Sequence, residues 1–221
     1  MSISRATSLA RSCAAVTGGT VILHGSLALG GYRPGRSDID LLLITSSPLP
    51  SDAVPRLLSI ASGAPLDLHV VSAAVVARPT SAPGVLLYAG HGDVAVDVPS
   101  DPDFVVELSV ARAHGVTLVG SDPPDAVIGP VPASWVVDRG RYWLTRWREL
   151  TDDVEHARFM VLTACRMWRF AVEGAHSPKA EAGRWALERD PSLVAITAAL
   201  ADAPIPPPEI SRVLNAALHR S

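Results

Sequence analysis

The spacing of apolar residues changes once along this chain, and that change restricts the possible folds most strongly. Before Pro130, short apolar and β-branched runs predict strands at residues 20–24, 38–44 and 66–71, with helical patterns between them. After Pro132 only helical periodicity remains, and it predicts helices at residues 135–150, 155–173, 177–189, 191–203 and 206–219. The pattern indicates an α/β domain with a mixed sheet, residues 1–132, followed by an all-helical bundle domain, residues 133–221.

Other segments of the first domain carry weaker patterns. Helical spacing predicts helices at residues 1–16, 51–61 and 104–114, and a short extended piece at residues 116–120. Residues 73–100 contain Pro79, Pro83 and several glycines, so we expect irregular structure there, with residues 84–89 forming either a strand or a helix.

Charge and composition exclude several classes of protein. The chain has 19 Lys and Arg against 22 Asp and Glu, a formal charge of -3, which argues against a nucleic-acid binder and favours a cationic small molecule. No apolar run approaches the roughly 20 residues needed to cross a bilayer, and no secretory signal is recognisable. The two cysteines, Cys13 and Cys165, are typical of buried residues in a reducing compartment, so we expect a cytoplasmic protein.

Three carboxylates lie on two of the predicted strands. Asp38 and Asp40 project to the same face of a strand while Ile39 points to the core, and Asp67 shares a face with His69 on the next predicted strand. If the two strands are neighbours, the three carboxylates converge. Oxygen-only clusters suit Mg²⁺, which binds through one or two carboxylates and substrate phosphates. The pattern favours nucleoside triphosphate chemistry.

A bend precedes these carboxylates. Gly25 and Ser26 end the first predicted strand, and a turn at the head of a helix offers backbone N–H groups and a hydroxyl to phosphate oxygens. Neither a P-loop nor a Rossmann fingerprint is present. Taken singly, an Asp-x-Asp on a strand is more often a solvated face, and Gly-Ser is a common turn. Their order along the chain favours an enzyme.

This order of residues resembles the DNA polymerase β-type nucleotidyltransferase superfamily. More narrowly, the chain is similar to the aminoglycoside 3''/9-adenylyltransferases, which inactivate streptomycin and spectinomycin. That closer resemblance rests on the helical domain. The resemblance as a whole spans most of the chain, from about residue 22 to residue 191. Its matching residues are Val161, Leu162, Thr163, Arg166, Met167, Trp168, Gly174, Ser177, Pro178, Lys179, Trp185, Ala186 and Leu187.

The resemblance implies magnesium-dependent transfer of AMP from ATP to a hydroxyl of such an antibiotic, with release of pyrophosphate. It implies that Asp38 and Asp40 hold Mg²⁺ and that Asp67 is the catalytic base and a further metal contact. ATP would be contacted by Gly25, Ser26, Ser37, Arg166 and Lys179, the last being the only lysine of the chain. The drug would be contacted by Trp147, Asp152 and His156. The resemblance also implies a monomer with a cleft between its domains.

The chain departs from the family at three places. Asp67 stands where the family has a glutamate, His156 stands where it has an acidic drug contact, and its Glu-Trp pair is not recognisable between Pro83 and Asp97. Alternatives therefore stay open: the same chemistry on another small-molecule or protein hydroxyl, or a non-catalytic nucleotide-binding protein. Trp147 could equally be a core aromatic residue, and Asp152 a helix cap.

Overall fold

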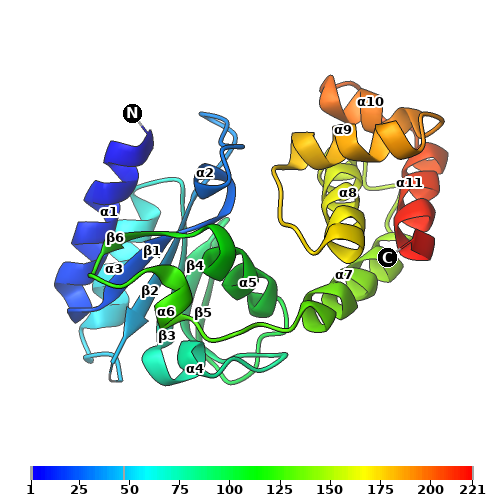
Figure 1. The fold of residues 1–221 in the computed structure, drawn as a ribbon. Helices are drawn as coiled ribbons and strands as arrows, with labels where there is room; N and C mark the ends of the chain where they lie inside the picture. The colour runs from blue at the N-terminus through cyan, green and yellow to red at the C-terminus, as the bar shows by residue number, and fades with distance from the viewer. Residues whose placement is uncertain (1, 47, 221) are drawn as a thin grey trace. The chain divides into compact units, whose positions relative to one another are not determined.

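The structure, a computed structural model, describes residues 2–46 and 48–220. The chain divides into two compact units, the first ending at Val131 and the second beginning at Pro132. Figure 1 shows strands and helices in the first unit and only helices in the second. Within the described residues, no helix is long and apolar enough to cross a membrane.

The first unit is built on one mixed sheet with the strand order β5-β4-β3-β2-β1-β6. Only β2 and β3 pair in parallel, and the other neighbours pair antiparallel. The strands are β1 (Thr20–Leu23), β2 (Ile39–Thr45), β3 (Leu66–Ser72), β4 (Val85–Gly90), β5 (Asp93–Val98) and β6 (Val116–Val119).

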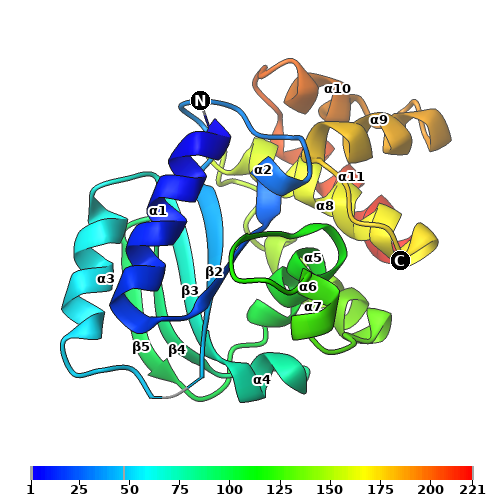
Figure 2. The ribbon, with the colours of Figure 1, turned by 60° about the vertical axis from the view of Figure 1, so that its left-hand side comes forward.

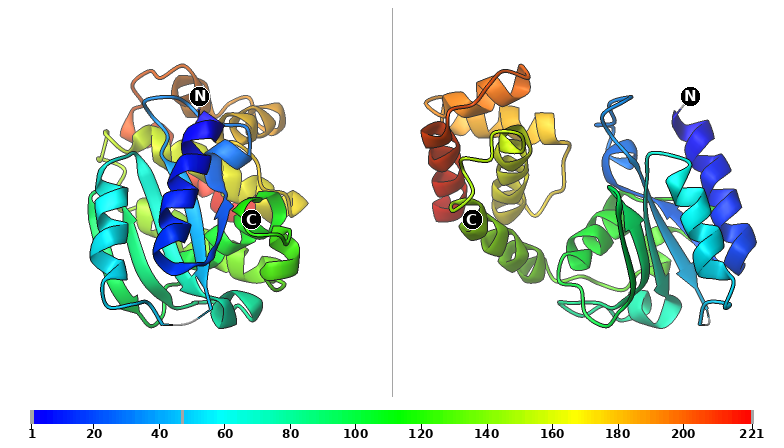
Figure 3. Two further views of the ribbon diagram at one scale, coloured as in Figure 1. Left: turned by 90° about the vertical axis from the view of Figure 1, so that its left-hand side faces the viewer. Right: turned by 180° about the vertical axis from the view of Figure 1, so that it is seen from behind.

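Helices cover both faces of this sheet because its central strands are apolar on both faces. On β2, Leu41 and Leu43 are buried toward α1 and α3, whereas Leu42 and Ile44 are buried toward α5. Figure 2 and the left panel of Figure 3 show α1 and α3 side by side over one face. The helices of this unit are α1 (Ser2–Thr17), α2 (Gly25–Ala28), α3 (Ala53–Ser62), α4 (Ala73–Ala77), α5 (Phe104–His114) and α6 (Pro124–Val127).

Residues 73–100 are more regular than the sequence indicates. They form α4 and the β4–β5 hairpin, so the expectation of irregular structure there is wrong. The hydroxyl of Ser72 caps α4 by accepting a hydrogen bond from the backbone N–H of Val75 at 3.3 Å. The hairpin turns through His91 and Gly92, whose φ angles of 52° and 86° match a type I′ turn. Strand β5 lies at the edge of the sheet, and its side chains are mostly exposed.

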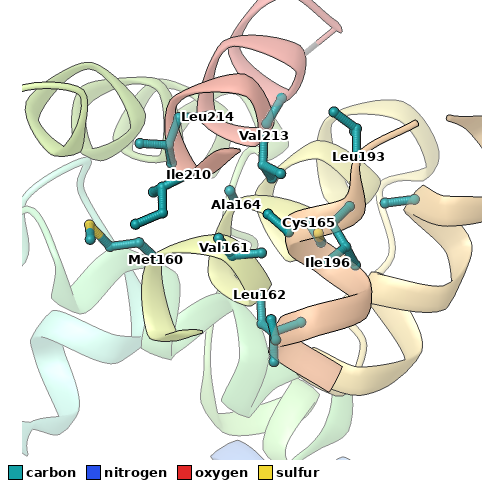
Figure 4. Close-up of a cluster of buried hydrophobic side chains, with 14 of the residues drawn as sticks. Met160, Val161, Leu162, Ala164, Cys165, Leu193, Ile196, Ile210, Val213 and Leu214 are labelled. Carbon is teal, nitrogen blue, oxygen red and sulfur yellow. The ribbon is translucent and has the colours of Figure 1, made fainter. Parts of the chain in front are cut away.

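The second unit packs its helices around α8. Figure 4 shows side chains of α8, α10 and α11 converging, including Val161, Cys165, Ile196 and Leu214. The helices are α7 (Ala133–Trp147), α8 (Ala157–Glu173), α9 (Lys179–Arg189), α10 (Val194–Leu200) and α11 (Pro207–Arg220). Helix α10 is shorter than predicted at both ends, because the residues before Val194 form turns and Ala201 and Asp202 end the helix.

A polar cluster joins α8 to α9. Glu173 accepts hydrogen bonds from Arg169 at 2.9 Å, from Arg189 at 3.2 Å and from the indole N–H of Trp185. The hydrogen bonds from Arg169 and Trp185 hold the pKa of Glu173 below its ordinary value. Because its pKa is lower in the folded state, Glu173 stabilises the fold above its ordinary pKa and loses this effect as the pH falls through the folded value.

We expect Glu173→Gln to lower the Tm of the protein at pH 7, because the neutral amide lacks the negative charge to which all three donors are hydrogen-bonded. The difference in Tm from the parent protein should shrink as the pH falls below 4.5, the ordinary pKa of the residue. Thermal unfolding followed by circular dichroism across pH measures this. Glu149→Gln, which breaks only the exposed pair with Arg146, is the matched control and should change Tm little. An equal effect of the two variants would contradict the assignment.

Candidate active site

Two carboxylates lie side by side on the central parallel strands. In the β2–β3 register Asp40 is directly opposite Asp67, and Asp38 immediately precedes β2. Leu66, Leu68 and Ile39 are buried in the core on the other face, as the alternation predicts. The two strands are therefore neighbours, as convergence of the carboxylates requires, and Asp40 and Asp67 lie on the face covered by α5.

The bend after β1 holds Asp40 in place. The backbone N–H of Ser26 donates to Oδ2 of Asp40 at 3.1 Å, and the backbone N–H of His24 donates to the carbonyl oxygen of Asp40 at 3.0 Å. Gly25 has a φ of +61°, and a Cβ there would lie 2.0 Å from Oδ2 of Asp40. Only glycine therefore allows the bend to approach this carboxylate so closely.

The two serines near the carboxylates differ in their surroundings. The Oγ of Ser26 is buried and has no hydrogen-bond partner among the described residues. A buried hydroxyl without a partner is costly unless a ligand satisfies it. The Oγ of Ser37 accepts a hydrogen bond from the backbone N–H of Arg33 at 3.1 Å, which shapes the loop before Asp38.

Asp67 lies in a largely enclosed place, with its side chain 14% exposed. The hydroxyl of Tyr88 donates to its Oδ2 at 3.4 Å, and Nδ1 of His69 lies 3.5 Å from its Oδ1. Burial, followed by the charges of Asp40 and Glu107, raises the pKa of Asp67 to about 7. Burial also raises the pKa of Asp40. A carboxylate with a raised pKa is a better proton acceptor near neutral pH.

His91, at the tip of the β4–β5 hairpin, contacts two of the carboxylates. Its Nδ1 lies 3.2 Å from Oδ2 of Asp38, and its Nε2 lies 3.2 Å from Oδ2 of Asp67. The imidazole is thus a bridge between two acids from different strands. The sequence-based interpretation missed His91 because the whole segment was expected to be irregular, although a His-Gly pair between two apolar runs is a recognisable hairpin signal.

A second histidine, His24, lies between β1 and the bend. His24 is 2% exposed, and its Nδ1 lies 3.4 Å from Oε2 of Glu107 on α5. Burial lowers the pKa of His24, but the hydrogen bond and charge of Glu107, together with the charges of Asp40 and Asp67, outweigh burial and raise it. His24 and Glu107 were not singled out from sequence, because nothing in the pattern indicates that α5 approaches the bend.

The donor set suits a hard divalent cation. Within the described part of the chain, Oδ1 of Asp67 is buried without a hydrogen-bond partner. The carboxylates of Asp38, Asp40 and Asp67 offer only oxygen ligands, which Mg²⁺ prefers. Across residues 2–46 and 48–220, however, no three His, Cys, Asp or Glu side chains stand already arranged to hold a metal ion. The imidazole of His91 lies between Asp38 and Asp67, the acids that such an ion would share.

The two cations predicted to contact ATP belong to the helical unit. Lys179 is the first residue of α9, and its Nζ lies 4.2 Å from the ring centroid of Phe159 on α8. Arg166 lies two helical turns after Phe159, so both face the same side of α8. Phe159, Arg166 and Lys179 therefore form one cationic and aromatic surface of this unit.

The predicted drug contacts follow along α7 and the loop after it. Trp147 is 8% exposed and lies between Trp143, stacked at 5.8 Å, and Phe159, edge-on at 5.7 Å. Most of its surface is therefore part of the core. Asp152 is exposed in the loop, and the exposed His156 precedes α8 with its Nδ1 2.8 Å from Oδ2 of Asp153.

Family models match both units of the chain. A model described as nucleotidyltransferase domain matches residues 9–113, and one described as aminoglycoside adenylyltransferase, C-terminal domain, matches residues 126–203. The first match contains Asp38, Asp40 and Asp67, and the second contains Arg166 and Lys179. The chain therefore has a nucleotidyltransferase domain and is an enzyme of that class.

Known proteins agree with both matches. Aminoglycoside (3'') (9) adenylyltransferases of Klebsiella pneumoniae and Escherichia coli are each 31% identical over 190 residues, which cover 78% of this chain and 72% of theirs. A crystal structure of spectinomycin adenyltransferase from Enterococcus faecialis with ATP and spectinomycin has a TM-score of 0.76 at 16% identity, covering 99% of this chain and 97% of that one. This structure shares the fold. The chain belongs to the aminoglycoside (3'') (9) adenylyltransferase family.

Proposed function

We propose that this protein transfers AMP from ATP to a hydroxyl of streptomycin, spectinomycin or both, in a magnesium-dependent reaction that releases pyrophosphate. The observation that carries the proposal is Asp40 directly opposite Asp67 on parallel strands, beside the bend of Gly25 and Ser26. The names of the relatives and of the spectinomycin-bound structure support the choice of acceptor.

The candidate site residues of the first unit have distinct roles in this reaction. Asp38, Asp40 and Asp67 would hold Mg²⁺, which when bound neutralises negative charge on the triphosphate. The buried hydroxyl of Ser26 and the bend around it bind phosphate oxygens. Asp67 accepts the proton of the acceptor hydroxyl, whose oxygen bonds to the α-phosphorus while the bond to the β-phosphate breaks and pyrophosphate leaves.

The helical unit supplies groups for both substrates. Arg166 and Lys179 bind the negatively charged ATP. Asp152 and the edge of Trp147 meet the cationic acceptor, since a carboxylate beside an aromatic ring suits a guanidinium or ammonium group. The overall charge of -3 favours association with such an acceptor.

The first test is direct. After incubation with ATP and Mg²⁺, mass spectrometry should detect streptomycin or spectinomycin with an added AMP.

Asp67→Asn should lower the rate of AMP transfer about 10²- to 10⁴-fold, because it removes the proton acceptor. Asp97→Asn, an exposed change on β5 at a left-handed φ that asparagine tolerates, is the matched control and should retain the parent rate. An unchanged rate in a folded Asp67→Asn protein would refute its role as base.

The close approach of the bend gives a second prediction. Gly25→Ala should abolish AMP transfer, because its Cβ would displace the carboxylate of Asp40. Gly30→Ala is the matched control: its φ of +77° is similar, but nothing lies within 4 Å of a Cβ there. Both variants carry the backbone strain of about 1 kcal/mol, so only the difference between them reports the clash. Steady-state rates and Tm of the two variants measure this difference. Equal activities would show that AMP transfer does not need the close approach of Gly25 to Asp40.

A third prediction concerns the acceptor. Asp152→Asn should raise KM for streptomycin about tenfold with little change in kcat, because it removes a charge partner of the bound cation. Spectinomycin, which lacks the guanidinium groups, should be affected less. Glu155→Gln removes an exposed acid from the same loop and is the control. Equal effects of Asp152→Asn and Glu155→Gln on KM would indicate general charge attraction rather than a specific contact.

A further inference from the structure

The imidazole of His91 occupies the position between two carboxylates of the candidate active site. Each ring nitrogen is 3.2 Å from one carboxylate oxygen, Nδ1 from Asp38 and Nε2 from Asp67. The ring therefore bridges the two acids with different nitrogens, whereas a ligand of a shared cation would direct one nitrogen toward the ion. This arrangement suits an imidazole that takes the place of a cation between the two acids, rather than one that binds the cation beside them.

The hairpin presents this ring from the rim of the site. His91 is the first of two residues in the turn, and its side chain is 63% exposed, in contrast with the largely enclosed Asp67. Its φ of 52° is a left-handed conformation that asparagine and glycine adopt more easily than histidine. The ring is thus attached to an exposed two-residue turn and can leave the carboxylates without disturbing the sheet.

Taking the proposed function as the starting point, we propose that His91 is a displaceable occupant of the cation position: its imidazole competes with the divalent ion for Asp38 and Asp67. Both contacts must break before these two oxygens can bind one ion. The ring separates two acids that repel each other, which keeps the site ordered until ATP brings the metal. When displaced, the ring returns to solvent at the tip of the hairpin.

Metal binding can be measured without turnover. The probe is Mn²⁺ alone, titrated into the purified full chain in the absence of ATP and followed by electron paramagnetic resonance of the free ion. We expect His91→Gly to tighten the Kd for Mn²⁺ about fivefold, which is the size expected from two partly exposed ion-pair contacts. Glycine keeps the left-handed turn, and His91→Asn is a second variant that keeps it as well.

Three control proteins define the site that the titration reports. Asp67→Asn should weaken Mn²⁺ binding in the parent protein, and His91→Gly should give little gain in the Asp67→Asn background. His219→Ala, which removes an exposed histidine at the end of α11, should leave the Kd unchanged. A Kd that is unchanged or weaker in both His91 variants would overturn the proposal, since weaker binding would make His91 a ligand of the ion.

The same proteins separate this inference from the proposed function. If the parent protein transfers AMP but His91→Gly binds Mn²⁺ no more tightly, then His91 does not compete with the ion and the proposed function is unaffected. If His91→Gly binds Mn²⁺ more tightly but the parent protein modifies neither antibiotic, the cation site stands and the proposed reaction is wrong.

Discussion

The parallel pairing of β2 with β3 is the constraint on which the rest of the active site depends. It places Asp40 opposite Asp67, so that two acids share a partly buried face. Burial raises the pKa of both, and the charge of Asp40 raises the pKa of Asp67 further. The structure offsets this cost locally. A backbone N–H of the bend binds Asp40, and a tyrosine hydroxyl and an imidazole contact Asp67. Close pairs of like charges with shifted pKa values are typical of functional sites.

The bend after β1 and the acid on β2 depend on each other for their positions. Gly25 allows the chain to leave β1 against the side chain of Asp40, and the N–H of Ser26 then meets the carboxylate. The same turn leaves the Ser26 hydroxyl buried, with no hydrogen-bond partner among the residues that the structure describes. One local conformation thus positions an acid and prepares a polar group for a phosphate, which is why a short glycine-containing motif is informative about function in this chain.

Elements with strong patterns could be predicted from sequence. The strands containing Asp40 and Asp67 were found because their apolar residues alternate or run together, and the helical unit was found because Val161, Cys165 and Trp168 recur at helical spacing. The hairpin was missed because the prolines and glycines around it indicate irregular structure, although the valines of β5 stand at alternate positions. His91 and Tyr88 contact the acids, and Glu107 contacts His24, only through tertiary packing, which a local sequence pattern does not reveal.

Lys179 lies against the ring of Phe159 at the beginning of α9, and it is the only lysine in the chain. Every other permanently basic side chain is a guanidinium, which amine-directed acylating reagents leave untouched. Acylation of side-chain amines would therefore alter a single, known position of the protein. The molecule has a built-in chemical handle for attaching a fluorophore or crosslinker at the surface shared by Phe159 and Arg166.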